Sequence, residues 1–205
     1  NKLCISKFTK ELATYNSSLP INIHSSIFVR YDMNDIRNVK ALIIGPKDTP
    51  YENGCFIFDI LIPNNYPNEP PKVNLQTTGN GTVRFNPNLY NSGKVCLSLL
   101  GTWSGELGEK WNKDTSTLLQ VLVSIQSLIF VENPYFNEPG YEKGMHTELG
   151  KNKNFKYNDN TRYNSIKWAI NENITNPCPE FKDLILNHFK LKKDEINKTI
   201  NEWYS

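Results

Sequence analysis

The chain has 205 residues, 38% hydrophobic and 12% aromatic, a length that suits one domain with extensions and a core that needs no disulfides. Lysine and arginine number 23 against 21 aspartates and glutamates, and a net charge of +2 argues against a nucleic-acid partner. No apolar run approaches the roughly 20 residues of a membrane span, and the first residues show no signal-peptide pattern. We therefore expect a cytoplasmic, monomeric domain, and the sequence leaves open whether it belongs to a larger chain.

The first expected element is an amphipathic helix over residues 2–15, in which Phe8, Leu12 and Tyr15 recur at helical spacing. Pro20 forbids its continuation. Four β-branched or aromatic runs then predict strands, with glycine and proline in the connections between them. These runs are residues 27–31, 39–44, 55–62 and 73–77. Short connections of this kind favour an antiparallel meander.

From residue 78 to about residue 111 the sequence has neither helical nor strand periodicity. A segment this long without regular structure is uncommon in a compact domain and is usually functional or disordered. Its aromatic and apolar residues argue against disorder. They are Phe85, Leu89, Tyr90, Val95 and Leu97. We therefore expect a packed loop, and packed loops carry sites.

The most apolar segment, residues 115–131, predicts a helix that begins at a Thr115 or Ser116 cap. It is apolar nearly all round, with Val123 and Leu128 outside the main stripe, so we expect it to be buried on every face.

The carboxy-terminal part of the chain is expected to begin with a polar loop over residues 140–157. Apolar residues then recur at helical spacing and predict helices near 160–175, 179–189 and 192–204. The whole pattern predicts an α+β fold. We expect a core over residues 1–157 and a helical extension over residues 158–205 that docks on it, because isolated helices of this length are marginal in water.

Four cysteines are the candidates for metal binding or nucleophilic chemistry. None forms a C-x-x-C pair, so no zinc or other metal site is expected. Cys4 and Cys55 fall on predicted helix and strand positions, which favours burial. Cys178 lies between two prolines at a helix start, which favours a structural role. Cys96 lies in the packed loop.

Cys96 follows a run of special residues. Asn88, the last residue of Asn86-Pro87-Asn88, lies eight residues before it. This segment resembles the active-site signature of ubiquitin-conjugating enzymes, in which a His-Pro-Asn tripeptide precedes the catalytic cysteine at the same spacing. Other motifs match the family in the same order, and the resemblance covers about residues 1–170. These motifs are residues 45–54, residues 63–71, Trp111 and Asn133-Pro134.

The resemblance implies the ubiquitin-conjugating fold and an acyl transferase. Such an enzyme accepts ubiquitin from the ubiquitin-activating enzyme as a thioester, here on Cys96, and passes it to lysines of protein substrates. It implies no cofactor, because ATP is spent by the separate activating enzyme. Thioester exchange needs a reactive thiolate, and Asn88 has the neutral amide that could stabilise the oxyanion of the transfer step. Alternatively, Asn88 only hydrogen-bonds the loop backbone, and both roles can hold together.

Two departures from the family concern the site. The histidine of its tripeptide is Asn86 here; because that histidine is mainly structural in the family, activity should survive. The family often has an acidic residue that gates the incoming lysine, and the candidates here are Asn137 and Glu138. Glu138 could help to deprotonate the lysine, or it could be a solvated loop carboxylate.

A third departure concerns ligases. The candidate ligase-docking loops contain Pro67, Asn68, Asn112 and Lys113. Asn68 stands where the family has a phenylalanine anchor, and interfaces depend on a few such anchors, so ordinary ligase binding should be weak. The nearby insertion Gly101–Lys110 could replace those contacts through Trp103, or Trp103 could simply pack within the loop. Whether a separate ligase is needed stays open.

Two other functions stay possible. One is a catalytically silent ubiquitin-binding module with the same fold, although such relatives lose the cysteine that this chain retains. The other is a conjugating enzyme for another ubiquitin-like modifier. A narrower likeness, in residues 85–88, 100–103 and 134–141, is to conjugating domains within giant chains that combine conjugating and ligase activity. We therefore expect the conjugating part of something similar.

Overall fold

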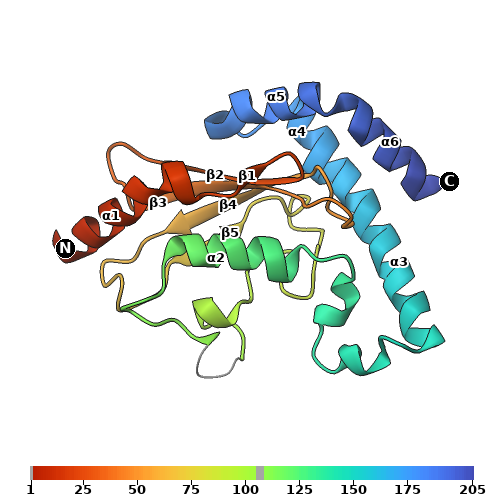
Figure 1. The fold of residues 1–205 in the computed structure, drawn as a ribbon, viewed down its shortest axis with the longest axis horizontal. Coiled ribbons are helices and arrows are strands. Elements are labelled where there is room, and N and C mark those ends of the chain that lie inside the picture. Colours follow the sequence, from red (N-terminus) through yellow and green to blue (C-terminus); the bar gives the residue numbers. More distant parts are fainter. Residues whose placement is uncertain (1, 105–108) are drawn as a thin grey trace.

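The computed structural model describes residues 2–104 and 109–205. Helix α1 (Lys2–Ser18) leads into an antiparallel sheet with the strand order β1-β2-β3-β4-β5 (Figure 1). The strands are β1 Ile21–Asn22, β2 Ser25–Tyr31, β3 Asn38–Ile44, β4 Cys55–Leu61 and β5 Lys72–Leu75. The expected meander and the α+β class are confirmed, and the two-residue strand β1 is an addition at the edge.

The central strands β3 and β4 are mostly buried on both faces, and their successive side chains point to opposite sides of the sheet. Residues of one face pack with α1 and with α2 (Leu118–Ser124), the helix on that side of the sheet (Figure 1). These inner-face residues are Val39, Ala41 and Ile43 of β3 and Phe56, Phe58 and Ile60 of β4. The outer-face residues of the same strands form a second apolar cluster with the carboxy-terminal helices. They are Leu42, Ile44, Cys55 and Ile57.

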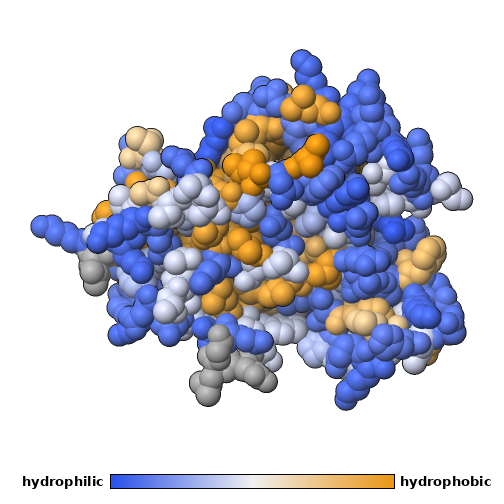
Figure 2. Space-filling view, viewed as in Figure 1, coloured by the Kyte–Doolittle hydropathy of each residue, from blue (hydrophilic) through white to orange (hydrophobic). Residues whose placement is uncertain are grey.

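Helix α2 differs from its prediction at its start and on its surface. Its cap is Thr117 rather than Thr115 or Ser116, because Thr117 and Gln120 form a reciprocal capping box. The helix continues as a π-helical turn, η3 (Ile125–Ile129). The expectation that Val123 and Leu128 are buried is wrong, since 36% and 61% of their surfaces are exposed. Apolar residues accordingly gather on the surface in the region of α2 (Figure 2).

The expectation of a loop over residues 140–157 is also wrong. After the short turns η4 (Pro134–Asn137) and η5 (Tyr141–Gly144), α3 begins at Glu148. It continues through η6 and α4 to Thr175, and its elements are α3 Glu148–Asn164, η6 Ser165–Asn171 and α4 Glu172–Thr175. Its first half lacks apolar periodicity because the buried stripe is polar. That stripe contains Asn154, Asn158, Thr161 and Ser165.

The carboxy-terminal helices α5 (Lys182–Leu191) and α6 (Lys193–Tyr204) follow a short turn, η7 (Pro179–Phe181), and lie over the outer face of the sheet (Figure 1). Phe181 of η7 and Ile185 and Phe189 of α5 are buried and pack on that face. The expected boundary between residues 157 and 158 falls inside α3, and a division of the chain into two units stays a prediction. None of the helices within the described residues is long and apolar enough to cross a membrane.

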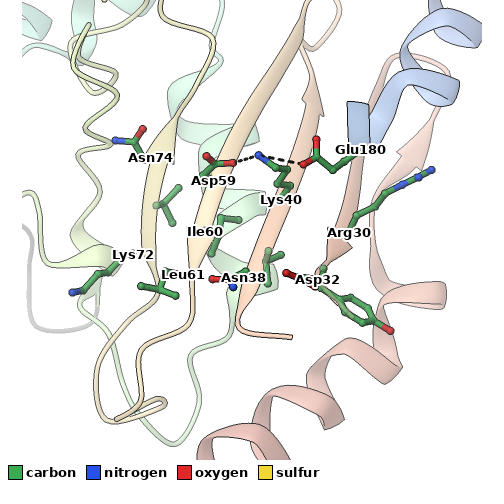
Figure 3. A pocket seen from close by; sticks show the side chains of 13 residues that line it. Arg30, Asp32, Asn38, Lys40, Asp59, Ile60, Leu61, Lys72, Asn74 and Glu180 are labelled. Atoms are coloured by element: carbon green, nitrogen blue, oxygen red, sulfur yellow. Dashed lines mark hydrogen bonds and ion pairs between the residues drawn. The ribbon is translucent and has the colours of Figure 1, made fainter. Parts of the chain in front are cut away.

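Ion pairs also connect η7 and α5 to strands β2 and β3. Lys40 of β3 lies between Asp59 of β4 at 2.6 Å and Glu180 of η7 at 3.8 Å (Figure 3). Asp183 of α5 accepts from Arg30 of β2 at 2.9 Å. A cavity of about 730 Å³ remains beside these pairs, on the part of the outer face that the helices leave open.

The packing of η7 and α5 on the sheet generates a stability prediction. Phe181→Ala should lower the free energy of unfolding by about 3–5 kcal/mol, because a fully buried aromatic ring is lost and a cavity remains. Leu191→Ala, at a residue that is 85% exposed, should change it by less than about 0.5 kcal/mol. Urea unfolding of both variants measures this. Equal stabilities would mean that the helices do not dock on the core in solution.

Candidate active site

The segment from Phe85 to Cys96 folds back on itself and places Asn88 beside the cysteine. The backbone N–H of Cys96 donates to the carbonyl oxygen of Asn88 at 2.8 Å, and Asn88 Nδ2 donates to the carbonyl oxygen of Cys96 at 2.8 Å. Gly93 makes the return possible: its φ is +86°, and a Cβ there would collide with Asn74 of β5. The two residues that the spacing pattern singled out are therefore hydrogen-bonded neighbours.

Asn86 lies under this pair and is fully buried. Its Nδ2 donates to the Tyr51 hydroxyl at 3.0 Å and to the Ile129 carbonyl oxygen at 2.8 Å. Its Oδ1 accepts from the backbone N–H of Asn88 at 2.8 Å and from Asn137 Nδ2 at 3.3 Å. The residue in the position of the family's histidine thus uses both ends of its amide to join four segments of the chain.

The amide of Asn88 makes the backbone hydrogen bond that the structural alternative predicted. A carboxamide nitrogen carries two hydrogens. One N–H of Asn88 is therefore engaged by the Cys96 carbonyl, and this bond sets the direction of the other. A structural role and an electrostatic role are compatible in this geometry.

Cys96 is nearly buried, with 2% of its surface exposed. This burial raises the pKa of its thiol above the ordinary value, and the positive charges of Lys94 and Arg84 oppose the rise. Arg84 also packs over the ring of Tyr90 and donates to the Pro87 carbonyl oxygen at 2.7 Å. Two cations thus favour the thiolate form of Cys96, and the sequence analysis assigned a role to neither.

A groove with a volume of about 660 Å³ is lined by Asn88 and by Leu97, the residue that follows Cys96. Leu99 of η1 (Ser98–Leu100), Gln120 of α2 and Leu128 of η3 also line it. The larger cavity on the outer face of the sheet shares none of these residues. The groove next to Cys96 is therefore the one that could hold a polypeptide attached to the cysteine.

The two gate candidates have different surroundings. Asn137 lines the groove and donates through Nδ2 to Asn86 and, at 3.1 Å, to the carbonyl oxygen of Leu128. The Glu138 carboxylate lies 3.6 Å from the Arg84 guanidinium. Asn137 thus hydrogen-bonds to the buried amide of Asn86, whereas Glu138 forms an ion pair with Arg84 near the surface of the site.

The candidate ligase-docking loops lie together. Trp111 Nε1 donates to the Pro67 carbonyl oxygen at 2.6 Å, which joins the loop of Pro67 and Asn68 to the segment of Asn112 and Lys113. Asn68, Asn112 and Lys113 are exposed, so this surface is polar. Trp103, at the start of the insertion Gly101–Lys110, also lines the groove. Residues 105–108 of the insertion lie outside the described part of the chain.

The other three cysteines are free thiols. Cys4 and Cys55 are buried, as expected, with 1% and 0% of their surfaces exposed. Cys178 is partly exposed, and its Sγ lies 3.1 Å from Glu180 Oε2. Across residues 2–104 and 109–205, no three metal-binding side chains of the His, Cys, Asp or Glu type come together as a metal site would need.

An antiparallel meander packed on a central helix, with a cysteine and an asparagine paired on a packed loop, defines the class of ubiquitin-conjugating folds. The family model described as ubiquitin-conjugating enzyme matches residues 7–164. The chain belongs to the ubiquitin-conjugating enzyme family.

Its relatives include the human protein named dual E2 ubiquitin-conjugating enzyme/E3 ubiquitin-protein ligase BIRC6, which is 54% identical over 96% of this chain and 4% of its own length. A probable ubiquitin-conjugating enzyme of Acanthamoeba polyphaga mimivirus, E2 R521, is 45% identical over 99% of this chain and 14% of its own length. The probable ubiquitin-conjugating enzyme protein 17 of Caenorhabditis elegans is 50% identical over 96% of this chain and 27% of its own length. The chain thus spans only a small part of these relatives, and the likeness to conjugating domains of giant chains is confirmed.

The environment of Cys96 predicts its reactivity. The pKa of the Cys96 thiol is raised, and only the thiolate reacts. The rate of alkylation by iodoacetamide should therefore rise about tenfold per pH unit between about pH 7 and pH 9. Lys94→Gln should slow alkylation near neutral pH, since it removes a positive charge that favours the thiolate. Mass spectrometry of the Cys96 peptide measures both. Lys143→Gln, an exposed lysine elsewhere, is the control, and a rate independent of pH would indicate a lowered pKa instead.

Proposed function

We propose that this chain accepts ubiquitin on Cys96 and transfers it to lysines of protein substrates. The observation that carries the proposal is the hydrogen-bonded pair of Asn88 and Cys96, of which Asn88 lines a groove together with Leu97. The family membership supports it, because the relatives are named ubiquitin-conjugating enzymes. The groove beside the thiol suits the extended carboxy-terminal tail through which ubiquitin would be attached.

Two acyl transfers make up the reaction. First, the Cys96 thiolate attacks the carbonyl carbon of the ubiquitin thioester on the activating enzyme, and that enzyme's thiolate leaves. Second, a neutral lysine amine attacks the new thioester, the C–N bond forms, and the C–S bond to Cys96 breaks. The amine loses a proton in this step, and the Cys96 thiolate is regenerated. The chain needs no cofactor for either transfer, because ATP is spent earlier by the activating enzyme.

Asn88 supplies the electrostatic part of the second transfer. The tetrahedral intermediate carries a negative oxygen, and a preorganised amide N–H stabilises that charge without reorganisation. The hydrogen bond from Asn88 to the Cys96 carbonyl holds the amide next to the reacting sulfur, and its second N–H is the donor.

Glu138 is the acidic group proposed to receive the substrate lysine. A carboxylate within hydrogen-bonding reach of the ammonium can position it and assist its deprotonation. Arg84 now lies 3.6 Å from this carboxylate, so an incoming lysine would exchange with a cation that is already present. Asn137, whose amide is engaged with Asn86 and Leu128, is proposed to shape the wall of the groove.

The name of the human relative supports a wider proposal, that this conjugating domain works together with ligase activity in one polypeptide. A reducing compartment such as the cytoplasm suits the chemistry, because Cys96 must remain a free thiol. The partners proposed are ubiquitin, its activating enzyme and protein substrates.

Charging of Cys96 tests the proposal. With activating enzyme, ATP and ubiquitin, the chain should form an adduct that reducing agent removes, and Cys96→Ser should form a more stable oxyester. Cys178→Ala, which changes a partly exposed cysteine outside the site, is the matched control and should charge normally. A panel of ubiquitin-like modifiers in the same assay identifies the modifier. Charging of Cys96→Ala at the rate of the unchanged protein would overturn the proposal.

Replacement of Asn88 separates the two transfers. Asn88→Ala should slow discharge to free lysine by about 10²–10³, the range for loss of an oxyanion donor, and should slow charging less. Asn91→Ala is the control, because Asn91 is an exposed asparagine of the same loop whose Nδ2 bonds Gly81. Equal losses in both steps, together with a lower melting temperature, would show that Asn88 is only structural.

A further inference from the structure

The turn Asp48–Gly54, which connects β3 to β4, lies between the carboxy-terminal helices and the active-site loop. Asp48 and Asn53 have φ values of +63° and +61°, in the left-handed region. Residues other than glycine adopt this conformation at a cost, so the surrounding structure must hold it. The contacts of this turn therefore decide its shape.

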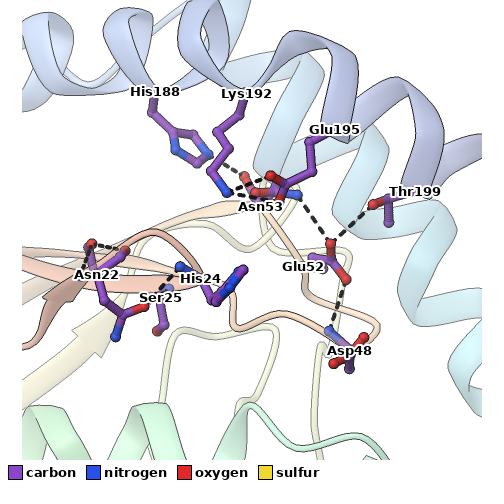
Figure 4. A network of polar contacts seen from close by, with 11 residues as sticks. Asn22, His24, Ser25, Asp48, Glu52, Asn53, His188, Lys192, Glu195 and Thr199 are labelled. Carbon is purple, nitrogen blue, oxygen red and sulfur yellow. Dashed lines mark hydrogen bonds and ion pairs between the residues drawn. The ribbon is translucent and has the colours of Figure 1, made fainter.

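On one side the turn is held by the carboxy-terminal helices (Figure 4). Thr199 of α6 donates to Glu52 Oε1 at 3.0 Å, and His188 Nε2 of α5 donates to the Asn53 carbonyl oxygen at 3.0 Å. Glu52 Oε2 accepts from the backbone N–H of Asp48 at 2.9 Å. Glu52 is only 7% exposed, and a buried carboxylate needs such partners, so these contacts fix the turn against both helices.

On the other side the turn contacts the active-site loop through Tyr51. Its side chain is fully buried, with its ring centroid 4.8 Å from that of Phe130. Its hydroxyl donates to the Phe85 carbonyl oxygen at 2.9 Å and accepts from Asn86 Nδ2 at 3.0 Å. Asn86 in turn accepts the backbone N–H of Asn88. The hydrogen bonds of α5 and α6 thus end on Glu52 and Asn53. Tyr51, the residue before Glu52 in the backbone of the same turn, begins the hydrogen bonds that run through Asn86 to Asn88, beside Cys96.

We infer that Tyr51 is a positioning residue for lysine transfer, and that α5 and α6 support it by fixing the turn Asp48–Gly54. The inference rests on the proposed function. A displaced Tyr51 hydroxyl would leave Asn86 with a missing partner, and the amide of Asn88 would lose its alignment. Charging depends less on Asn88 than transfer to lysine does, so the effect falls mainly on transfer to lysine. The carboxy-terminal helices therefore take part in catalysis from the far side of the sheet.

Tyr51→Phe tests the positioning role, since it removes the hydroxyl and keeps the ring. In single-turnover discharge of the Cys96 adduct, the maximal rate should fall by about tenfold, near the effect of one well-placed hydrogen bond, with the half-saturating lysine concentration unchanged. Tyr15→Phe, at a buried tyrosine of α1, is the matched control and should keep its rate. Combined with Asn88→Ala, Tyr51→Phe should cause no further loss, because it acts through Asn88.

Thr199→Val tests the contribution of the helices and does not alter the active-site loop. It should slow discharge by about twofold to fivefold, because it removes one partly exposed hydrogen bond whose loss water can partly compensate, and it should leave charging unchanged. Thr175→Val is the control, because Thr175 bonds only within its own helical region. Melting temperatures show that each variant is folded during the assay.

The outcomes separate this inference from the proposed function. If the unchanged chain forms no thioester on Cys96, the proposed function fails. If it forms the thioester and Tyr51→Phe discharges at the rate of Tyr15→Phe, the inference alone fails. An equal further loss in the Asn88→Ala background, or equal rates for Thr199→Val and Thr175→Val, would also overturn it.

Discussion

The buried carboxamide of Asn86 is the constraint on which the active site depends. A buried polar group that lacks a partner costs about 1–3 kcal/mol, so each end of this amide must be satisfied in place. Its partners come from the turn before β4, the end of the central helix, the last residue of η4 and the active-site loop itself. These four segments are therefore held in one arrangement by a single side chain. The carbonyl oxygens of Leu128 and Ile129 are available to Asn137 and Asn86 because they lie at the end of a helix, where carbonyl groups have no partner within the helix.

Much of this fold could be predicted from the sequence, since the strands are runs of β-branched and aromatic residues and short connections favour a meander. The helix beginning at Glu148 could not, because its buried stripe is made of Asn154, Asn158 and similar polar residues that hydrogen-bond to the loop before it. Apolar periodicity detects only helices that bury apolar faces. The exposure of Leu128 was missed for the related reason that composition does not tell which side of an apolar helix is covered.

The site was predictable to the extent that it is local. Cys96 and Asn88 are close in sequence, and the pattern that names them also brings them together. Arg84 and Tyr51 were missed, since their roles arise from contacts with Glu138 and Asn86 that no spacing pattern encodes. The one signal for Tyr51 was its place in a turn motif, which accounts for the shape of the turn and gives no indication of a hydrogen bond 35 positions away.

The geometry divides the chemistry of the site into two parts with different physical controls. Charge and burial control the thiol, because Lys94 and Arg84 oppose a rise in the pKa of Cys96 that desolvation causes. Hydrogen bonds control the amide, because the direction of Asn88 follows from Asn86 and the Cys96 carbonyl. The charges of Lys94 and Arg84 are accessible to solvent, so salt should weaken their effect on the thiol. The second control lies in the protein interior, where low dielectric strengthens hydrogen bonds and salt has little access. A site built in this way can change its thiol reactivity through surface charge and leave the alignment needed for transfer to lysine unaltered.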